Sequence, residues 1–220
     1  MRRIRWTAPI AAAAAVLALT GAPALAAPGL QPATARLAGL TGGELLGEEL
    51  AQVLALRASE NPYAGAGPSC FHAGPRGKVL MVWLREDGAT CTVKPGTPVF
   101  FMAYWWECST VESGSDYGGE TFAEQQACAL REFQKHAPPE MFATVDGRST
   151  RLDTPTFLAT SPQRTIALLP DNVFGTEQTS ATFAAVGWVG LLRPLTPGTH
   201  SIATSAGVSA TIDVVPGYKS

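Results

Sequence analysis

The chain has few of the residues from which enzyme active sites are commonly built. It contains three histidines among 220 residues, His72, His136 and His200. It also lacks the Gly-x-Ser-x-Gly elbow that presents a nucleophilic serine in many hydrolases; Ser115 lies one place off that pattern. Because a catalytic triad needs a histidine beside an activated nucleophile, the sequence assigns no catalytic residues.

Metal-binding spacings are also missing. The four cysteines are 21, 17 and 20 residues apart and form no Cys-x-x-Cys pair, which argues against a structural zinc site. Cys128, His136 and Met141 are the residue types of a blue-copper centre. However, eight helical positions between Cys128 and His136 separate them by about 12 Å, too far for shared coordination. We therefore predict no cofactor and no copper site.

Acidic residues gather in one segment but lack the Asp-x-Asp spacing of a calcium loop. They are Glu107, Glu112, Asp116 and Glu120. Solvated loop charges are a sufficient explanation, and we assign no metal ligand among them. Paired-carboxylate chemistry needs a separation of about 5 to 10 Å, which a sequence does not establish.

The chain has no basic surplus and, after its N-terminus, no apolar run long enough to span a membrane. Residues 1–26 have a basic start, an Ala-rich apolar stretch and an Ala24-Leu25-Ala26 end, the pattern of a cleaved signal peptide. Without Arg2, Arg3 and Arg5, 13 basic residues remain against 18 acidic ones, for a formal net charge of −5. We predict a secreted protein that binds no nucleic acid and has no membrane span after cleavage.

Four cysteines in an oxidising compartment predict two disulfides. Of the three connectivities, we favour Cys70 with Cys91 and Cys108 with Cys128. Each of these pairs closes a loop of about 20 residues, which stabilises the chain by about 3 kcal/mol in the chain-entropy model. We expect no free thiol.

The pattern of apolar and turn residues predicts a mainly β fold of the α+β class, an antiparallel β-sandwich with two accessory helices. Residues 27–62 are expected to form a flexible N-terminus up to residue 40 and a helix over 41–58. Residues 63–220 form the disulfide-stapled sandwich domain, with an inserted helix near 121–136. Both helices begin with a capping box, Thr-x-x-Glu.

Strands are expected wherever short apolar runs lie between turn residues. Residues 99–108 are apolar on both alternating faces, which predicts a central strand covered on both sides. The remaining expected strands are 78–84 and 89–93 as one hairpin, 141–145 and 149–152 as a second, 164–169, 188–192, and 199–204 with 210–215 as a terminal hairpin.

The last third of the chain contains the segment from Leu168 to Gly175, the pair Gly187-Trp188, and the run Leu192-Arg-Pro-Leu-Thr-Pro-Gly-Thr-His-Ser-Ile202. In these segments the chain resembles a group of exported bacterial β-sandwich proteins of unknown function. Weaker similarity surrounds Gly77 and Cys91. The resemblance implies a secreted sandwich and transfers no activity and no site residues.

The expected central strand is unusually rich in aromatic residues. Phe100, Phe101, Tyr104, Trp105 and Trp106 could stack on a ligand, but strand aromatics usually fill the core, and we predict that both tryptophans are buried. We expect a non-catalytic binding or structural protein of the envelope or extracellular space with an unknown ligand. The alternative is a small secreted hydrolase with a loop-assembled site, which a concave pocket with converging titratable groups would favour.

Overall fold

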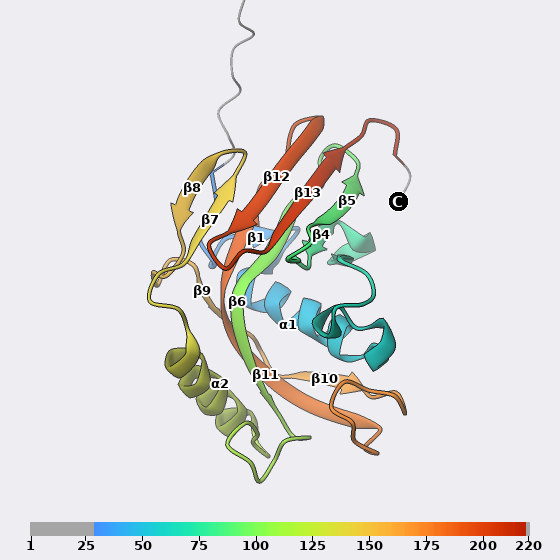
Figure 1. Ribbon diagram of the computed structural model, residues 1–220, viewed down its shortest axis with the longest axis vertical. Coiled ribbons are helices and arrows are strands. Elements are labelled where there is room, and N and C mark those ends of the chain that lie inside the picture. Colours follow the sequence, from blue (N-terminus) through green and yellow to red (C-terminus); the bar gives the residue numbers. More distant parts are fainter. Residues whose placement is uncertain (1–28, 219–220) are drawn as a thin grey trace, which may run out of the picture.

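The computed structural model describes residues 29–218, which form a mainly β fold with two α-helices (Figure 1). The predicted signal peptide lies outside the described residues. The helices are α1 (Gly42–Leu54) and α2 (Phe122–His136), with short 3-10 turns η1 (Ala58–Glu60), η2 (Pro62–Ala64) and η3 (Pro75–Gly77). The strands are β1 (Arg36–Leu37), β2 (Leu40–Thr41), β3 (Cys70–Ala73), β4 (Val79–Val82), β5 (Ala89–Val93), β6 (Val99–Ser109), β7 (Phe142–Val145), β8 (Arg148–Arg151), β9 (Leu158–Thr160), β10 (Arg164–Ala167), β11 (Ser180–Leu192), β12 (Gly198–Thr204) and β13 (Ser209–Val214).

Two sheets make up the body of the molecule, as the sequence predicts. The first has the order β10-β11-β6-β4-β3, with β9 also paired to β11, and the second has the order β5-β13-β12-β7-β8. The long strands β6 and β11 run the length of the molecule, and the second sheet lies over one end (Figure 1). The sandwich is not wholly antiparallel, since β4 pairs with β6 and β5 with β13 in parallel.

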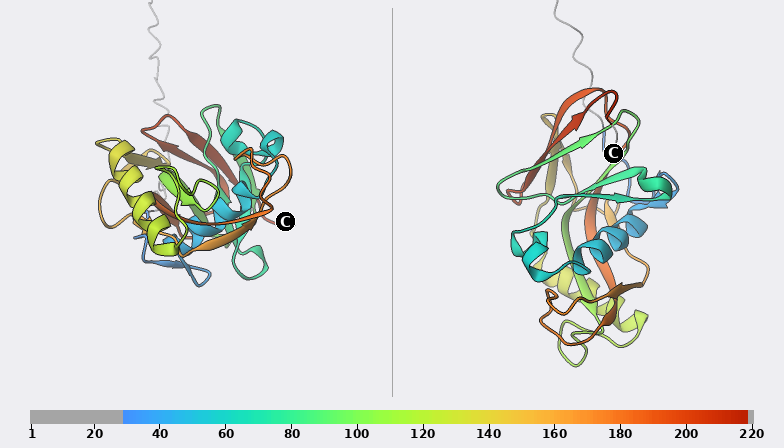
Figure 2. Two further views of the ribbon diagram at one scale, coloured as in Figure 1. Left: turned by 90° about the horizontal axis from the view of Figure 1, so that it is seen from below. Right: turned by 90° about the vertical axis from the view of Figure 1, so that its right-hand side faces the viewer.

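Strand β6 is central and covered on both faces over its first half. Val99 and Phe101 face the second sheet and α2, where they join a core containing Ile212 of β13 and Phe133 of α2. Phe100 faces the other way, into a core with the apolar stripe of α1. The views in Figure 2 show α1 and α2 as separate elements beside the long strands. The prediction of one face against a sheet and the other against a helix is therefore confirmed.

Both helices begin at the predicted capping boxes. The Thr41 hydroxyl accepts from the Glu44 amide while the Glu44 carboxylate accepts from the Thr41 amide, and Thr121 and Glu124 repeat the arrangement. Such a cap stabilises a helix by about 1 kcal/mol. The first helix ends at Leu54, four residues earlier than predicted, and η1 and η2 follow it.

Close packing explains one of the glycines of α1. A Cβ at Gly43 would lie 2.2 Å from the carbonyl oxygen of Thr160 in β9, so only glycine lets the helix sit this close to the sheet. The segment before α1 is also packed: β1 pairs with β2, and Ala33 and Leu37 are buried. The expected flexible segment is therefore ordered over its described part, because its few apolar residues reach the core.

The expected hairpin of residues 78–84 with 89–93 is wrong. Strand β4 belongs to the first sheet and β5 to the second, where β5 pairs with β13 in parallel. The burial patterns explain this choice: β4 is buried at every position, whereas β5 alternates buried and less buried residues as β13 does. The turn at residues 86–88 carries the chain from one sheet to the other.

The two predicted disulfides are confirmed, and the described residues contain no free cysteine. Because β3 and β5 lie in different sheets, Cys70–Cys91 joins the two sheets. Cys108–Cys128 joins the end of β6 to α2. The hairpins β7–β8 and β12–β13 also form as predicted. Strand β11 begins at Ser180, eight residues before its predicted start.

Candidate functional site

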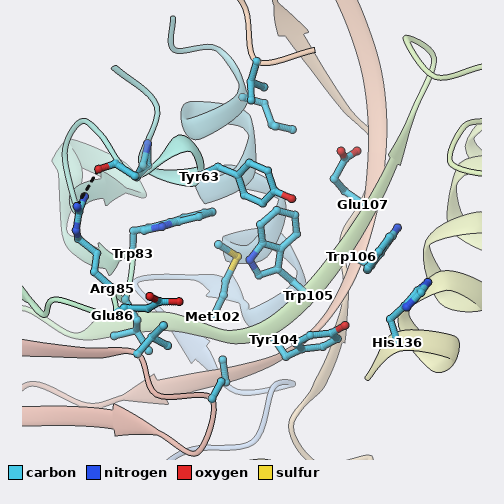
Figure 3. A pocket seen from close by; sticks show the side chains of 18 of the residues that line it. Tyr63, Trp83, Arg85, Glu86, Met102, Tyr104, Trp105, Trp106, Glu107 and His136 are labelled. Carbon is cyan, nitrogen blue, oxygen red and sulfur yellow. Dashed lines mark hydrogen bonds between the residues drawn. The ribbon is translucent and has the colours of Figure 1, made fainter. Parts of the chain in front are cut away.

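A groove of about 1280 Å³ runs along one edge of β6 (Figure 3). Its lining includes Trp105 and Trp106, whose side chains leave opposite faces of the strand because they are neighbours in sequence. A single groove can contact both only if it lies along the edge of the strand and opens to both faces. The groove is larger than the roughly 300 to 1,000 Å³ of small-molecule pockets.

The groove exists because β4 leaves β6 partway along it. The two strands pair only as far as Val82 and Phe101. Beyond Val82 the chain leaves this sheet, and Arg85 bridges to Ser209 of the second sheet. On this side β6 next meets a partner at Ser109, which bridges to Gly118. Within residues 29–218, the β6 segment 102–108 is therefore paired with β11 alone.

Aromatic rings form the wall of the groove on the α1 side. Trp105 contacts Trp83 edge to face with ring centroids 5.7 Å apart, and Tyr63 of η2 lies 5.9 Å from Trp105. Trp105 is therefore the central ring, in contact with both of the others. The three rings present one continuous apolar surface, and Tyr63 is 66% exposed on it (Figure 3).

The wall on the α2 side combines an aromatic stack with a helix end. Trp106 stacks on His136 with centroids 4.8 Å apart and the planes 11° from parallel. Tyr117 of the loop before α2 lies 6.3 Å from Trp106. His136 also lies 3.5 Å from the carboxylate of Glu132. This contact holds the imidazole ring at the mouth of the groove.

The two tryptophans are not core residues, contrary to the prediction. Both are half-buried, whereas Phe100 and Phe101 are fully buried. The difference follows from the neighbouring strand: β4 flanks β6 at Phe100 and Phe101 but has left by residue 105. Sequence alternation gives the face of a strand on which a side chain lies, but it does not show where the adjacent strand ends.

Glu107 is the unusual charged group of the groove. It is half-buried, yet its Oε2 atom is inaccessible and has no hydrogen-bond partner. Burial raises the pKa of Glu107 to about 8, and the nearby Glu112 carboxylate adds to the rise. Burial also raises the pKa of Glu112, although a hydrogen bond from the Ser109 hydroxyl at 3.1 Å opposes this. Two acids thus lie at one end of the groove, and the charge of Glu112 disfavours the ionisation of Glu107.

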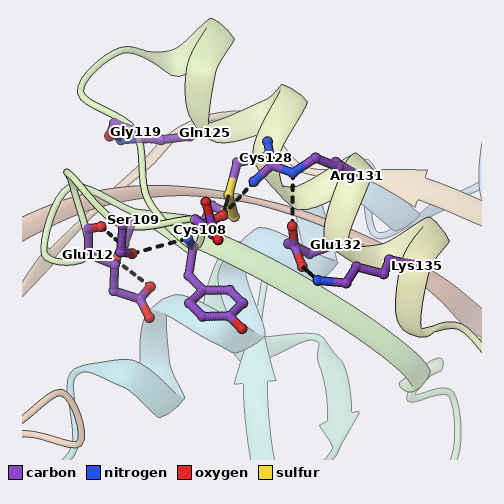
Figure 4. Close-up of a disulfide and its surroundings, with 12 residues drawn as sticks. Cys108, Ser109, Glu112, Gly119, Gln125, Cys128, Arg131, Glu132 and Lys135 are labelled. Atoms are coloured by element: carbon purple, nitrogen blue, oxygen red, sulfur yellow. Dashed lines mark hydrogen bonds and ion pairs between the residues drawn. A yellow bond between two sulfur atoms is a disulfide. The ribbon is translucent and has the colours of Figure 1, made fainter.

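The Cys108–Cys128 disulfide anchors this end of the groove to α2 (Figure 4). It follows Glu107 directly on β6. The backbone carbonyl of Asp116 accepts a hydrogen bond from Arg131, which ties the loop before α2 back to the helix. Arg131 and Lys135 pair with Glu132 on the same helix. The loop, the strand end and the helix are therefore held together around the acids.

The structure brings together only part of the predicted acidic cluster. Glu107 and Glu112 interact, whereas Glu120 accepts from Ser113 on the far side of the loop. Among residues 29–218 no group of three metal-ligating side chains is found. The sulfur of Cys128 is in a disulfide and is not available to copper.

No described histidine has the partners of a catalytic triad. Both ring nitrogens of His200 are occupied, by Asp146 at 2.7 Å and by the Thr196 carbonyl at 2.8 Å. His136 stacks on Trp106, and His72 lies exposed on β3. Over the part of the chain that the structure describes, no histidine hydrogen-bonds to a serine hydroxyl.

Comparisons with protein-family models, with curated proteins and with solved structures find no match. The resemblance to exported β-sandwich proteins therefore stays a prediction. No described helix is both long and apolar enough to cross a bilayer.

Proposed function

We propose that the protein is a secreted, non-catalytic binding protein whose ligand occupies the groove along β6. The observation that carries this proposal is the position of Trp105, half-buried and in contact with Trp83 and Tyr63 on an open wall. Large aromatic residues left partly exposed in a concave surface are typical of binding sites. The signal-like N-terminus and the two disulfides support secretion.

The alternative is a secreted hydrolase, and one specific observation favours it. A concave groove that contains Glu107 and Glu112 has the converging titratable groups that the alternative requires. A protonated carboxyl beside a second carboxyl is the arrangement of a general acid and its partner. Such a pair needs environments that push the two pKa values apart, whereas burial raises the pKa of both groups here.

Retention of small molecules on the immobilised protein tests the proposal. The probes are a peptic digest of casein and a digest of bacterial cell wall, and mass spectrometry identifies what is retained and whether it is cleaved. We expect retention of uncleaved compounds. Trp105→Ala should abolish it, because the central ring of the wall is lost.

The matched control is Phe122→Ala, which removes an exposed aromatic ring of α2 outside the groove and should leave retention unchanged. If neither digest is retained by the wild-type protein, the binding proposal is wrong. Cleavage that is lost in Glu107→Gln would establish the hydrolase instead.

A further inference from the structure

We infer that the ligand is an extended peptide segment that adds as a strand to the open edge of β6 and places a basic side chain beside Glu107. This inference rests on the proposed function and names the class of ligand that the groove binds. It is carried by the unpaired strand edge, by the two walls and by the unpaired acid at the end of the groove.

The backbone of β6 has free hydrogen-bonding groups facing the groove. In an antiparallel pair, alternate residues point their N–H and C=O groups toward the partner strand and away from it. The Ser109 carbonyl accepts from Gly119, on the side away from β11. By alternation, the backbone groups of Glu107 and Trp105 point the same way, into the groove. An incoming strand can therefore form hydrogen bonds with both residues.

The two walls suit the alternating side chains of a strand. Successive residues of an added peptide would point to opposite faces of the sheet, one toward Trp105 and Trp83 and the next toward Trp106 and Tyr104. The open segment, residues 102–108, is about 20 Å long at the usual strand rise, which matches five or six residues of peptide. A compact small molecule would leave most of this length empty.

The two carboxyl groups at one end of the groove favour a peptide with a basic residue. Glu107 has a buried oxygen without a partner and lies next to Glu112, while Trp105 on the same face offers an aromatic surface to a cation. A lysine or arginine of the peptide that lies beside the accessible part of this half-buried carboxyl would favour its ionised form. An acidic peptide would bring a third carboxylate to this end of the groove and is disfavoured.

The walls also select a single flexible chain over a folded partner. Exposed strand edges pair readily with the edges of other sheets unless they are covered. Here Tyr63 and Trp83 rise on one side of the edge and His136 and Tyr117 on the other. A lone extended segment fits between such walls, whereas the edge of a second folded domain brings its own neighbouring strands and side chains.

A backbone methylation scan tests the inference. A positional-scanning library of acetylated hexapeptide amides is titrated against the protein by fluorescence anisotropy, and the tightest binder is remade with one N-methyl group at each position. Methylation at two positions that lie two residues apart should weaken binding by tenfold or more, because those N–H groups bond to Trp105 and Glu107 of β6. Methylation at the residue between them should change binding less than twofold.

The charge is tested with the same peptide. Replacing its basic residue by norleucine should weaken binding to the wild-type protein about tenfold and should change binding to Glu107→Gln much less. Phe122→Ala serves again as the control with unchanged affinity.

Three outcomes would overturn the inference. One is a methylation scan without a two-residue period, and another is the absence of any binding hexapeptide. The third is a dimer in sedimentation velocity of the protein alone that Trp105→Ala dissociates, which would make a second copy the occupant. Retention of cell-wall sugars without peptide binding would leave the proposed function standing and would reject only the peptide.

Discussion

At the scale of single residues, Glu107 determines how stability depends on pH. Burial raises its pKa in the folded protein to about 8, from 4.5 for an exposed glutamate. The folded state therefore binds more protons than the unfolded state between these two values. It follows that the stabilising contribution is complete below about pH 4.5 and is lost as the pH rises through 8. Glu49, buried in α1 without a partner, contributes with the same sign.

We predict that the free energy of unfolding of the wild-type protein falls from pH 5 to pH 8. Glu107→Gln should make the unfolding free energy fall less steeply with pH. The slope can change by at most about 1.4 kcal/mol per pH unit, the value for one proton. Urea unfolding at four pH values measures it. Glu177→Gln, at an exposed position outside the groove, is the control and should keep the wild-type slope. An unchanged slope in Glu107→Gln would show that this carboxyl is solvated in the folded protein.

Substitution of Trp105 shows whether this residue contributes mainly to binding or to stability. Because Trp105 is half-buried in an open wall, Trp105→Ala should cost less than the roughly 3 to 5 kcal/mol typical of a large aromatic residue removed from a core. Phe101→Ala on the same strand, at a fully buried position, should cost that full amount. If both variants lost the same free energy of unfolding in denaturant, Trp105 would be a core residue.

At the scale of elements, α2 depends on its contact with the long strands. Phe133 is buried and lies 4.9 Å from Trp188 of β11 and 5.7 Å from Tyr104 of β6, centroid to centroid. Phe133→Ala should lower the free energy of unfolding by about 3 to 5 kcal/mol. Thr121→Ala, which removes only the cap, should lower it by about 1 kcal/mol. Circular dichroism during denaturation measures both losses of stability. A loss in Thr121→Ala as large as that in Phe133→Ala would contradict the prediction.

The elements also show which features a sequence can predict. The capping boxes, the two disulfides and the hairpins β7–β8 and β12–β13 depend on residues close together in the chain, and all were predictable. The partner of β5 was not, because a turn signal does not say in which sheet the next strand lies. The groove was missed for the same reason: it forms where β4 diverges from β6, and only the residue types of its wall were visible in the sequence.

At the scale of the whole molecule, the Cys70–Cys91 disulfide joins the two sheets. Replacing both cysteines by alanine should lower stability by about 3 kcal/mol for a loop of this length. The groove, which is lined by the first sheet, by residues of both helices and by loops, should keep its affinity for the peptide at temperatures where the variant is folded. A variant as stable as the wild type in thermal unfolding would mean that this disulfide contributes little.

Hydrogen exchange at the backbone amides of β6 tests the central claim most directly, because that claim is an open strand edge. All four residues lie opposite β11, but by alternation only the amides of Tyr104 and Trp106 point toward it. In the free protein we therefore predict slow exchange for Tyr104 and Trp106 and fast exchange for Trp105 and Glu107, whose amides face the groove. The bound hexapeptide should slow exchange at Trp105 and Glu107 and leave the other two unchanged. Slow exchange at all four amides of the free protein, or no added protection of Trp105 and Glu107 in the complex, would contradict the account.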